Sequence, residues 1–536
     1  RPTMRASHRS RGKRGTAVPR RVWPPALGVA AVIAFALLAG CTVGPSQRPS
    51  LVVGGAPPPA ATPSTSSAPP LPKLDTPSGS QIAWIDCTDV TRQRLGLATL
   101  PAGQTFQCAR VLSALDSPSA PGAGYTRLDL VKIGSGATPL VVVNDLGGMP
   151  GSLYAAQLAN VLPAQFLRTF SLIGVDRRGT GGSDPVHCVP ESDRAQIIGY
   201  DPTDTNLSGL LDASRDASQQ CILALDTRSA ALDTTRSAED LETIRQQLGV
   251  AHLNAIGHGE GSRVLTTYAN RYPGQVGRVV LDGAPDPTLN ATDTVTAQAA
   301  SAEAAFTAFA RDCVLRSCPL GADPKAALTQ LLAQLRQLPL AMPDGTEVTN
   351  GTAIHAVLTG LADRANWPAM ATAIANARAG NGDGLVALIG PVKDGTATDP
   401  ARLDAQLVSG CNDQPDRLAQ AEVTATVKSL SGKDPLFGGV LAQGLLLCAP
   451  WAVPSQHLAR PTAQGAPPIL VLSTANDPVT PVAGTQRTAH NLDAGVLVNW
   501  LGSGHGALGQ SGCATQAAQG FLVNGHLPAN PTTCPP

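Results

Sequence analysis

The sequence predicts an α/β fold: a mostly parallel sheet with helices on both faces and an inserted, largely helical cap. Three observations predict it. Short apolar runs alternate with helical patterns between residues 125 and 281, Ala-rich and Leu-rich helical spacing dominates residues 290–464, and two apolar runs follow at 468–473 and 495–500. Strands buried on both faces of a parallel sheet are expected to be continuously apolar. A length of 536 residues fits one large domain with such an insertion.

The first forty residues are predicted to be an export signal. They hold eight Arg and Lys residues and no acid, and an apolar run from Val22 to Leu38 follows this basic start. The residues Leu-Ala-Gly that precede Cys41 resemble a bacterial lipobox. We therefore expect Cys41 to be lipidated and the protein to be anchored to the outer face of the cytoplasmic membrane or secreted. The alternative is a single membrane-spanning anchor, for which the apolar run is short.

The segment after the signal has the composition of a linker. Residues 41–80 are rich in Pro, Ala and Ser and are expected to form an extended tether. Beyond residue 40 the chain carries 31 basic against 39 acidic residues. Because an acidic protein is repelled by phosphate backbones, we expect no nucleic-acid partner.

Apart from Cys41, the chain has ten cysteines. An even number in an exported chain favours disulfides, although the sequence alone leaves many connectivities open. Pairing of neighbours is attractive because each bond would close a local loop: Cys87–Cys108, Cys188–Cys221, Cys313–Cys318, Cys411–Cys448 and Cys513–Cys534. No Cys-x-x-Cys or His-x-x-x-His pair lies near them, so no metal site and no cofactor is expected.

The folded part divides into a first core segment (residues 81–289), the cap (290–464) and a second core segment (465–536). Strands are predicted in the first segment at 125–133, where alternation indicates an outer strand, and at 139–144, 170–176, 252–256 and 276–281. Helices are predicted at 237–248 and 262–270, and in the cap at 299–310 and 326–338.

The stretch from Gly257 to Gly261 lies between a predicted strand and a predicted helix. Strand, tight glycine turn and helix are the setting of the nucleophile elbow, G-x-S-x-G. Here Gly259 stands where the serine of that motif belongs. The sequence thus predicts a catalytic turn without its nucleophile.

Two later residues complete the expected chemistry. Asp477 follows the strand at 468–473, and His505 follows the strand at 495–500. An acid and then a histidine after successive late strands is the partner order of an α/β-hydrolase. Asp477 would orient the ring of His505 and stabilise its protonated form. His505 would take a proton from a nucleophile. Backbone amides of Gly148 or Met149 and of Glu260 would bind an oxyanion.

Motifs spread from about residue 81 to 534 carry a family resemblance. They are Asp176-Arg177-Arg178-Gly179-Thr180-Gly181-Gly182-Ser183, Thr234-Thr235, Tyr268-Ala269-Asn270-Arg271-Tyr272-Pro273, Val279-Val280-Leu281-Asp282-Gly283, Cys313, Cys318-Pro319-Leu320, Asp477-Pro478-Val479-Thr480-Pro481, His505-Gly506 and a tail that closes on Cys534. With them the chain resembles the secreted tripeptidyl-aminopeptidase-like branch of the α/β-hydrolases of actinobacteria. The resemblance implies hydrolysis near peptide N-termini.

The chain departs from that family in two places. Its oxyanion turn, residues 147–151, reads Gly-Gly-Met-Pro-Gly rather than Gly-Gly-Pro-Gly-Gly, and the serine is absent at Gly259. Ser262 lies three residues on, about 5 Å along the helix axis, and is expected to bond backbone rather than replace the serine.

Loss of a triad serine costs on the order of 10⁶ in turnover in a well-studied protease. The sequence therefore leaves two hypotheses open. In the first, the chain is a catalytically inactive protein of the cell envelope that holds peptides or small esters in an inherited cleft. In the second, it still hydrolyses with much reduced activity, through a water that His505 activates or through an unrecognised nucleophile. Glycine also relieves the strain of the apex, about 1–3 kcal/mol. Gly259→Ser is expected to create peptidase or esterase activity.

Overall fold

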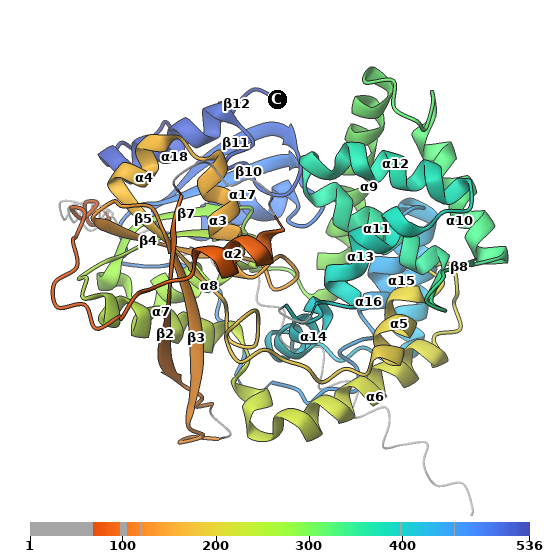
Figure 1. Ribbon diagram of the computed structural model, residues 1–536, viewed down its shortest axis with the longest axis horizontal. Coiled ribbons are helices and arrows are strands. Elements are labelled where there is room, and N and C mark those ends of the chain that lie inside the picture. Colours follow the sequence, from red (N-terminus) through yellow and green to blue (C-terminus); the bar gives the residue numbers. More distant parts are fainter. Residues whose placement is uncertain (1–67, 97–103, 118–119, 397–398, 455) are drawn as a thin grey trace, which may run out of the picture. The chain divides into compact units, whose positions relative to one another are not determined.

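The computed structural model describes residues 68–96, 104–117, 120–396, 399–454 and 456–536. The predicted export signal, Cys41 and the tether up to residue 67 lie outside the described residues. Figure 1 shows two halves: one holds the sheet with the helices that cover it, and the other is a helical lobe. Among the described residues, no helix is both long enough and apolar enough to cross a membrane.

A ten-stranded sheet forms the centre of the described part, in the order β1-β2-β3-β5-β4-β6-β7-β10-β11-β12. The strands are β1 (Ile85–Asp86), β2 (Phe106–Ala114), β3 (Tyr125–Ile133), β4 (Thr138–Val143), β5 (Phe170–Val175), β6 (Leu253–His258), β7 (Val276–Asp282), β10 (Ile469–Asn476), β11 (Gly495–Ser503) and β12 (Thr532–Cys534). From β5 to β12 neighbouring strands are parallel, and β1, β2, β3 and β5 pair antiparallel. A separate small sheet joins β8 (Leu340–Ala341) and β9 (Glu347–Val348).

Helices cover both faces of this sheet, which confirms the predicted fold class. One face packs against α3 (Gly151–Val161), α4 (Ala164–Thr169) and α18 (Gly512–Asn524), with α2 (Thr88–Leu95) beside α3. The other packs against α7 (Thr234–Leu248), α8 (Glu260–Arg271) and α17 (Val482–Asn491). Every residue of β4, β5, β6 and β7 is buried, so their apolar runs reflect burial from two sides.

The helical lobe has its own hydrophobic core and is built from more than one segment of the chain. It contains α9 (Ala291–Leu315), α10 (Pro324–Gln337), α11 (Asn350–Ala362), α12 (Trp367–Arg378), α13 (Asp383–Lys393), α14 (Arg402–Asp413), α15 (Gln420–Lys433) and α16 (Gly438–Gly444). It also contains α5 (Glu191–Gly199) and α6 (Ser208–Leu225), which lie in the segment predicted to be the first part of the core. Their apolar faces pack on the lobe rather than the sheet, so the lobe is not a single insertion (Figure 1).

The end of the predicted tether is folded, which corrects its boundary at residue 80. Leu71 and Leu74 pack against the hydrophobic cluster that α3 and α18 form with the sheet. The Asp75 carboxylate accepts hydrogen bonds from the amide and ring of His252. Two leucines therefore give this Pro-rich segment enough apolar surface to dock onto the core.

All five neighbour disulfides are present: Cys87–Cys108, Cys188–Cys221, Cys313–Cys318, Cys411–Cys448 and Cys513–Cys534.

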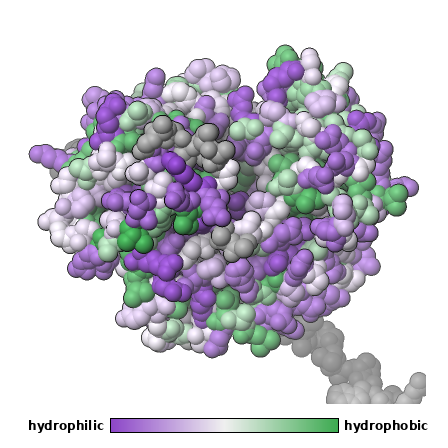
Figure 2. Space-filling view, in the orientation of Figure 1, coloured by the Kyte–Doolittle hydropathy of each residue, from purple (hydrophilic) through white to green (hydrophobic). Residues whose placement is uncertain are grey.

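Buried polar contacts also hold the described part together. Both guanidinium edges of Arg178 are used: Nε and Nη2 donate to Asp240, and Nη1 donates to the Ala231 carbonyl. On the face drawn in Figure 2, hydrophobic side chains lie scattered among hydrophilic ones, as is ordinary for a protein surface.

Candidate active site

The turn between β6 and α8 has the backbone of a nucleophile elbow. Gly259 sits at its apex with φ 53° and ψ −122°, a conformation that favours glycine. A Cβ at Gly257 would lie 2.7 Å from the Cα of Ser262, so the close approach of strand and helix also requires glycine there. The predicted strand, turn and helix are thus confirmed, with Gly259 at the apex.

Asp477 and His505 meet beside this apex. Asp477 follows β10 and is fully buried, and His505 follows β11. The Asp477 carboxylate accepts hydrogen bonds from the amides of Val479 and Thr480 and lies 3.0 Å from Nδ1 of His505. The structure therefore brings together the predicted acid and base in the orientation that a catalytic pair requires.

A second carboxylate, which the sequence pattern did not single out, occupies the space of the missing nucleophile. Asp145 follows β4, and its Oδ2 lies 2.7 Å from Nε2 of His505. Its Oδ1 accepts a hydrogen bond of 2.6 Å from the amide of Glu260. A Cβ built on Gly259 would lie closer than 3.0 Å to three atoms of this carboxyl group. Asp145 thus occupies the side-chain position of a nucleophile. It also engages the Glu260 amide, one of the predicted oxyanion donors.

The charges of this cluster support one another. Burial alone would raise the pKa of Asp145, but the charge and hydrogen bond of His505 outweigh it and lower that pKa to about 2. Burial likewise opposes ionisation of Asp477, whose pKa the charge of His505 lowers. Burial would lower the pKa of His505, yet Asp477 and Asp145 together raise it well above its usual value. The two carboxylates thus stabilise the imidazolium form of His505, which can donate to a carboxylate from each ring nitrogen.

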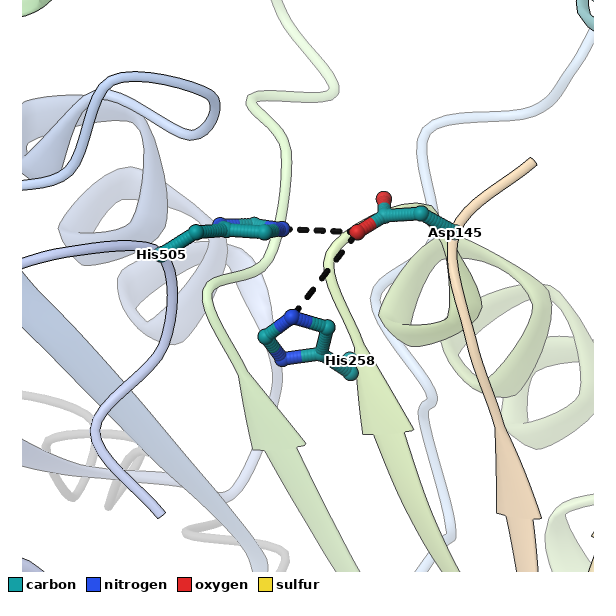
Figure 3. A group of neighbouring side chains, drawn as sticks. All are labelled: Asp145, His258 and His505. Atoms are coloured by element: carbon teal, nitrogen blue, oxygen red, sulfur yellow. Dashed lines mark hydrogen bonds and ion pairs between the residues drawn. The ribbon is translucent and has the colours of Figure 1, made fainter. Parts of the chain in front are cut away.

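His258, the last residue of β6, lies next to this group and was also not singled out from the sequence. Its Nε2 lies 3.9 Å from Oδ2 of Asp145, and its Nδ1 lies 3.5 Å from Oδ2 of Asp282, its register partner on β7. The ring stacks on Tyr154 and tilts against His505, with centroids 4.8 and 4.2 Å away. In Figure 3, the rings of His258 and His505 converge on the carboxylate of Asp145.

One sequence signal could have found both missed residues. Asp145 and His258 stand at the carboxyl ends of buried parallel strands, which is where open α/β sheets bind ligands. The local pattern shows Asp145 only as part of a glycine-rich turn. The side-chain orientations that place it over Gly259 depend on the pairing of β4 with β6, which the sequence does not specify.

Three other residues named in the sequence analysis lie near this cluster. Gly148 and Met149 line a large cavity beside the cluster, and the Met149 carbonyl accepts a hydrogen bond from Asn144. Ser262 is fully buried, and its hydroxyl donates to the carbonyl of Gly257 at 2.8 Å. As expected from the sequence, Ser262 bonds backbone.

This cavity has a volume of about 1270 Å³, and both the sheet side and the helical lobe contribute to its wall. From the sheet side come Asp145, His258 and His505. From the lobe come residues of α9, α11 and α14, including Asp293 and Asp413. The ligand atoms of Asp145, His258 and His505 all lie within 4.8 Å of one another, so within the part of the chain that the structure describes these three residues form a group that could hold a metal ion.

Known proteins similar to this chain are hydrolases. Residues 434–534 match the family described as TAP-like protein. The chain is 26% identical over 483 residues to the serine protease Hip1 of Mycobacterium tuberculosis, which covers 85% of this chain and 91% of that protein. It is 23% identical to a tripeptidyl aminopeptidase of Streptomyces lividans, covering 85% and 87%. An esterase structure from Exiguobacterium antarcticum covers 75% of this chain and 94% of its own, with 14% identity and a TM-score of 0.30.

Proposed function

We propose that this chain, which has the fold of the α/β-hydrolases and a C-terminal part that matches the TAP-like family, is an exported binding protein. Its serine-dependent peptidase activity is lost or much reduced, and its cleft holds peptides or small esters. One observation carries the proposal: the carboxylate of Asp145 fills the space of the side chain that Gly259 lacks. Export fits the five disulfides, because such bonds persist in oxidising compartments.

Asp145 opposes acyl transfer in three ways. Its Oδ1 already accepts the Glu260 amide, which is the donor that an oxyanion would need. Its negative charge would also repel an oxyanion formed at the same place. Because Nε2 of His505 donates to Asp145, it cannot act as a base there.

The cavity has the size and polarity of a ligand site. Its volume of about 1270 Å³ would accommodate a short peptide. Its wall holds the carboxylates of Asp293 and Asp363 together with arginines such as Arg263 and Arg460, while Asp286 pairs with Arg487. Carboxylates bind ammonium groups through charge-assisted hydrogen bonds. Peptides with a free amino terminus are therefore the proposed ligand class, in keeping with the aminopeptidase relative.

A second candidate is residual hydrolysis by a water that His505 activates. The retained pair of Asp477 and His505 favours it, because this pair is the general-base half of a hydrolase site. It requires Asp145 to leave Nε2 of His505 so that a water molecule can enter.

A fluorophosphonate probe separates the binding protein from a serine hydrolase. We expect no covalent labelling of the full chain, and mass spectrometry of the digested protein would identify any labelled serine. Labelling at a serine in the cleft would overturn the proposal, and its loss in Ser262→Ala would identify that residue as the nucleophile.

Thermal unfolding tests the binding function. Short peptides with a free amino terminus are expected to raise the melting temperature, because ligands that bind only the folded state stabilise it. The same peptides with an acetylated terminus are the matched control and should have little effect. Equal effects from both sets would contradict recognition of the amino terminus.

A further inference from the structure

Asp145, His258 and His505 direct one carboxylate oxygen and two imidazole nitrogens toward a common point at the cavity wall (Figure 3). We propose that these three residues form a binding site for one divalent transition-metal ion, with zinc as the probe. Two histidines and one carboxylate are a ligand set typical of zinc and of non-haem iron(II). The proposal goes beyond the proposed function, since metal binding requires no peptide.

The spacing of the ligand atoms suits a metal centre. Metal–ligand bonds of about 2.0–2.2 Å place the ligand atoms of a tetrahedral zinc ion roughly 3.4 Å apart. Oδ2 of Asp145 lies 2.7 Å from Nε2 of His505 and 3.9 Å from Nε2 of His258. These two distances bracket the tetrahedral value. Small rotations of the side chains would therefore complete the site without movement of the strands that carry them.

Carboxylates stand behind both histidines. Nδ1 of His505 lies 3.0 Å from Oδ2 of Asp477, and Nδ1 of His258 lies 3.5 Å from Oδ2 of Asp282. Metal-binding histidines commonly bond a carboxylate through the second ring nitrogen, which fixes the ring and leaves the first nitrogen for the metal. Each histidine here thus presents Nε2 to Asp145 with an acid behind it, and His505 would release its Nε2 proton to solvent when the metal binds.

His258 supports a ligand role independently. Its side chain is 10% exposed, and among the described residues its Nδ1 has no hydrogen-bond partner in spite of the nearby Asp282. Buried polar atoms are usually hydrogen-bonded, so the position of this ring leaves a bond from Nδ1 to Asp282 unmade. A metal ion on Nε2 would fix the ring proton on Nδ1, from which it could donate a hydrogen bond to Asp282.

The charge of the group also favours a dication. Three carboxylates, those of Asp145, Asp282 and Asp477, surround the two histidines at this wall. Asp145 and Asp477 bond His505, and Asp282 accepts hydrogen bonds from the amides of Ala507 and Leu508. A dication that replaces the Nε2 proton of His505 would keep these buried carboxylates paired. Its remaining coordination position would face the cavity, where a water molecule or a ligand carboxylate could bind.

Metal titration tests the proposal directly. The full chain is stripped with a chelator, dialysed and titrated with Zn²⁺ by calorimetry, and bound zinc is counted by elemental analysis. We expect one equivalent of zinc. Removal of an outer carboxylate partner of a metal-bound histidine typically costs 10–100-fold in affinity. Loss of a ligand should cost more, so His258→Gln and Asp145→Asn should each weaken zinc binding at least ~100-fold.

A histidine outside the cavity is the matched control. His252 also pairs with an aspartate, Asp75, and His252→Gln should leave zinc affinity unchanged. Cobalt(II) gives a second readout, since a tetrahedral site with two nitrogens and one oxygen produces visible absorption that His258→Gln should abolish. Circular dichroism of each stripped variant checks that it is folded. Failure of the parent chain to bind zinc, or equal binding by the parent and His258→Gln, would overturn the proposal.

Discussion

Replacing Gly259 by serine in two backgrounds tests whether Asp145 occupies the place of the nucleophile. In the parent chain, the new Cβ would lie closer than 3.0 Å to the carboxyl group of Asp145. The carboxylate would have to leave, and its bonds to the Glu260 amide and to His505 would be broken. In an Asp145→Ala background, the same serine meets open space. The two backgrounds should therefore respond differently to one substitution.

The structure sets the size of that difference. A side chain at φ 53° costs about 1–3 kcal/mol of strain in either background. Hydrogen bonds to charged groups contribute about 1.5–3 kcal/mol each, and Gly259→Ser removes two of them only where Asp145 is present. The free energy of unfolding should thus fall by about 4–9 kcal/mol in the parent and by about 1–3 kcal/mol in Asp145→Ala. The coupling between the two substitutions should be at least ~3 kcal/mol.

Urea unfolding followed by circular dichroism measures this double-mutant cycle, and fluorophosphonate labelling with a p-nitrophenyl ester assay measures chemistry. The doubly substituted chain is expected to react with the probe at the new serine. It should hydrolyse the ester on the order of 10²-fold faster than the parent, a small part of what a triad serine contributes. Gly259→Ser alone, which the sequence predicts to be active, should stay far below it. Stabilities that add within about 0.5 kcal/mol would refute the placement of Asp145.

Three further predictions concern stability. Burial, followed by the charge of a neighbouring aspartate, raises the pKa of Asp413 to about 6. Because the folded state holds this proton more tightly than the unfolded state, the free energy of unfolding should fall as pH rises from about 4 to 7. Asp413→Asn should therefore gain about 1–3 kcal/mol of stability at pH 8 but little at pH 4, as measured by urea unfolding at both pH values. Arg178→Met leaves the buried carboxylate of Asp240 unpaired and should cost about 3–5 kcal/mol in the same assay, whereas a loss under 1 kcal/mol would contradict a structural role. Replacing Cys411 and Cys448 by alanine opens a loop with a sequence separation of 37 and should cost roughly 4 kcal/mol, seen as a lower urea midpoint in comparison with the oxidised parent.

Much of the fold could be predicted because burial leaves a pattern in the sequence. Short runs made mostly of apolar residues marked the strands β4, β6 and β7, since parallel strands covered on both faces bury nearly all of their side chains. The helical lobe was less predictable. The helices α5 and α6 join it although they precede β6 in the chain, because an amphipathic helix shows that it has an apolar face but not which core that face meets.

The candidate site, like the fold, was predictable from the sequence only in part. The sequence by itself determined the elbow and the positions of Asp477 and His505, because glycine requirements and the order of residues after strands are local properties. Only the tertiary structure decided that Asp145 and His258 join them. Their side chains meet Gly259 and His505 through the pairing of β4, β6 and β7, which brings together residues more than a hundred positions apart. The sequence showed a missing serine, and the folded chain shows the carboxylate that stands in its place.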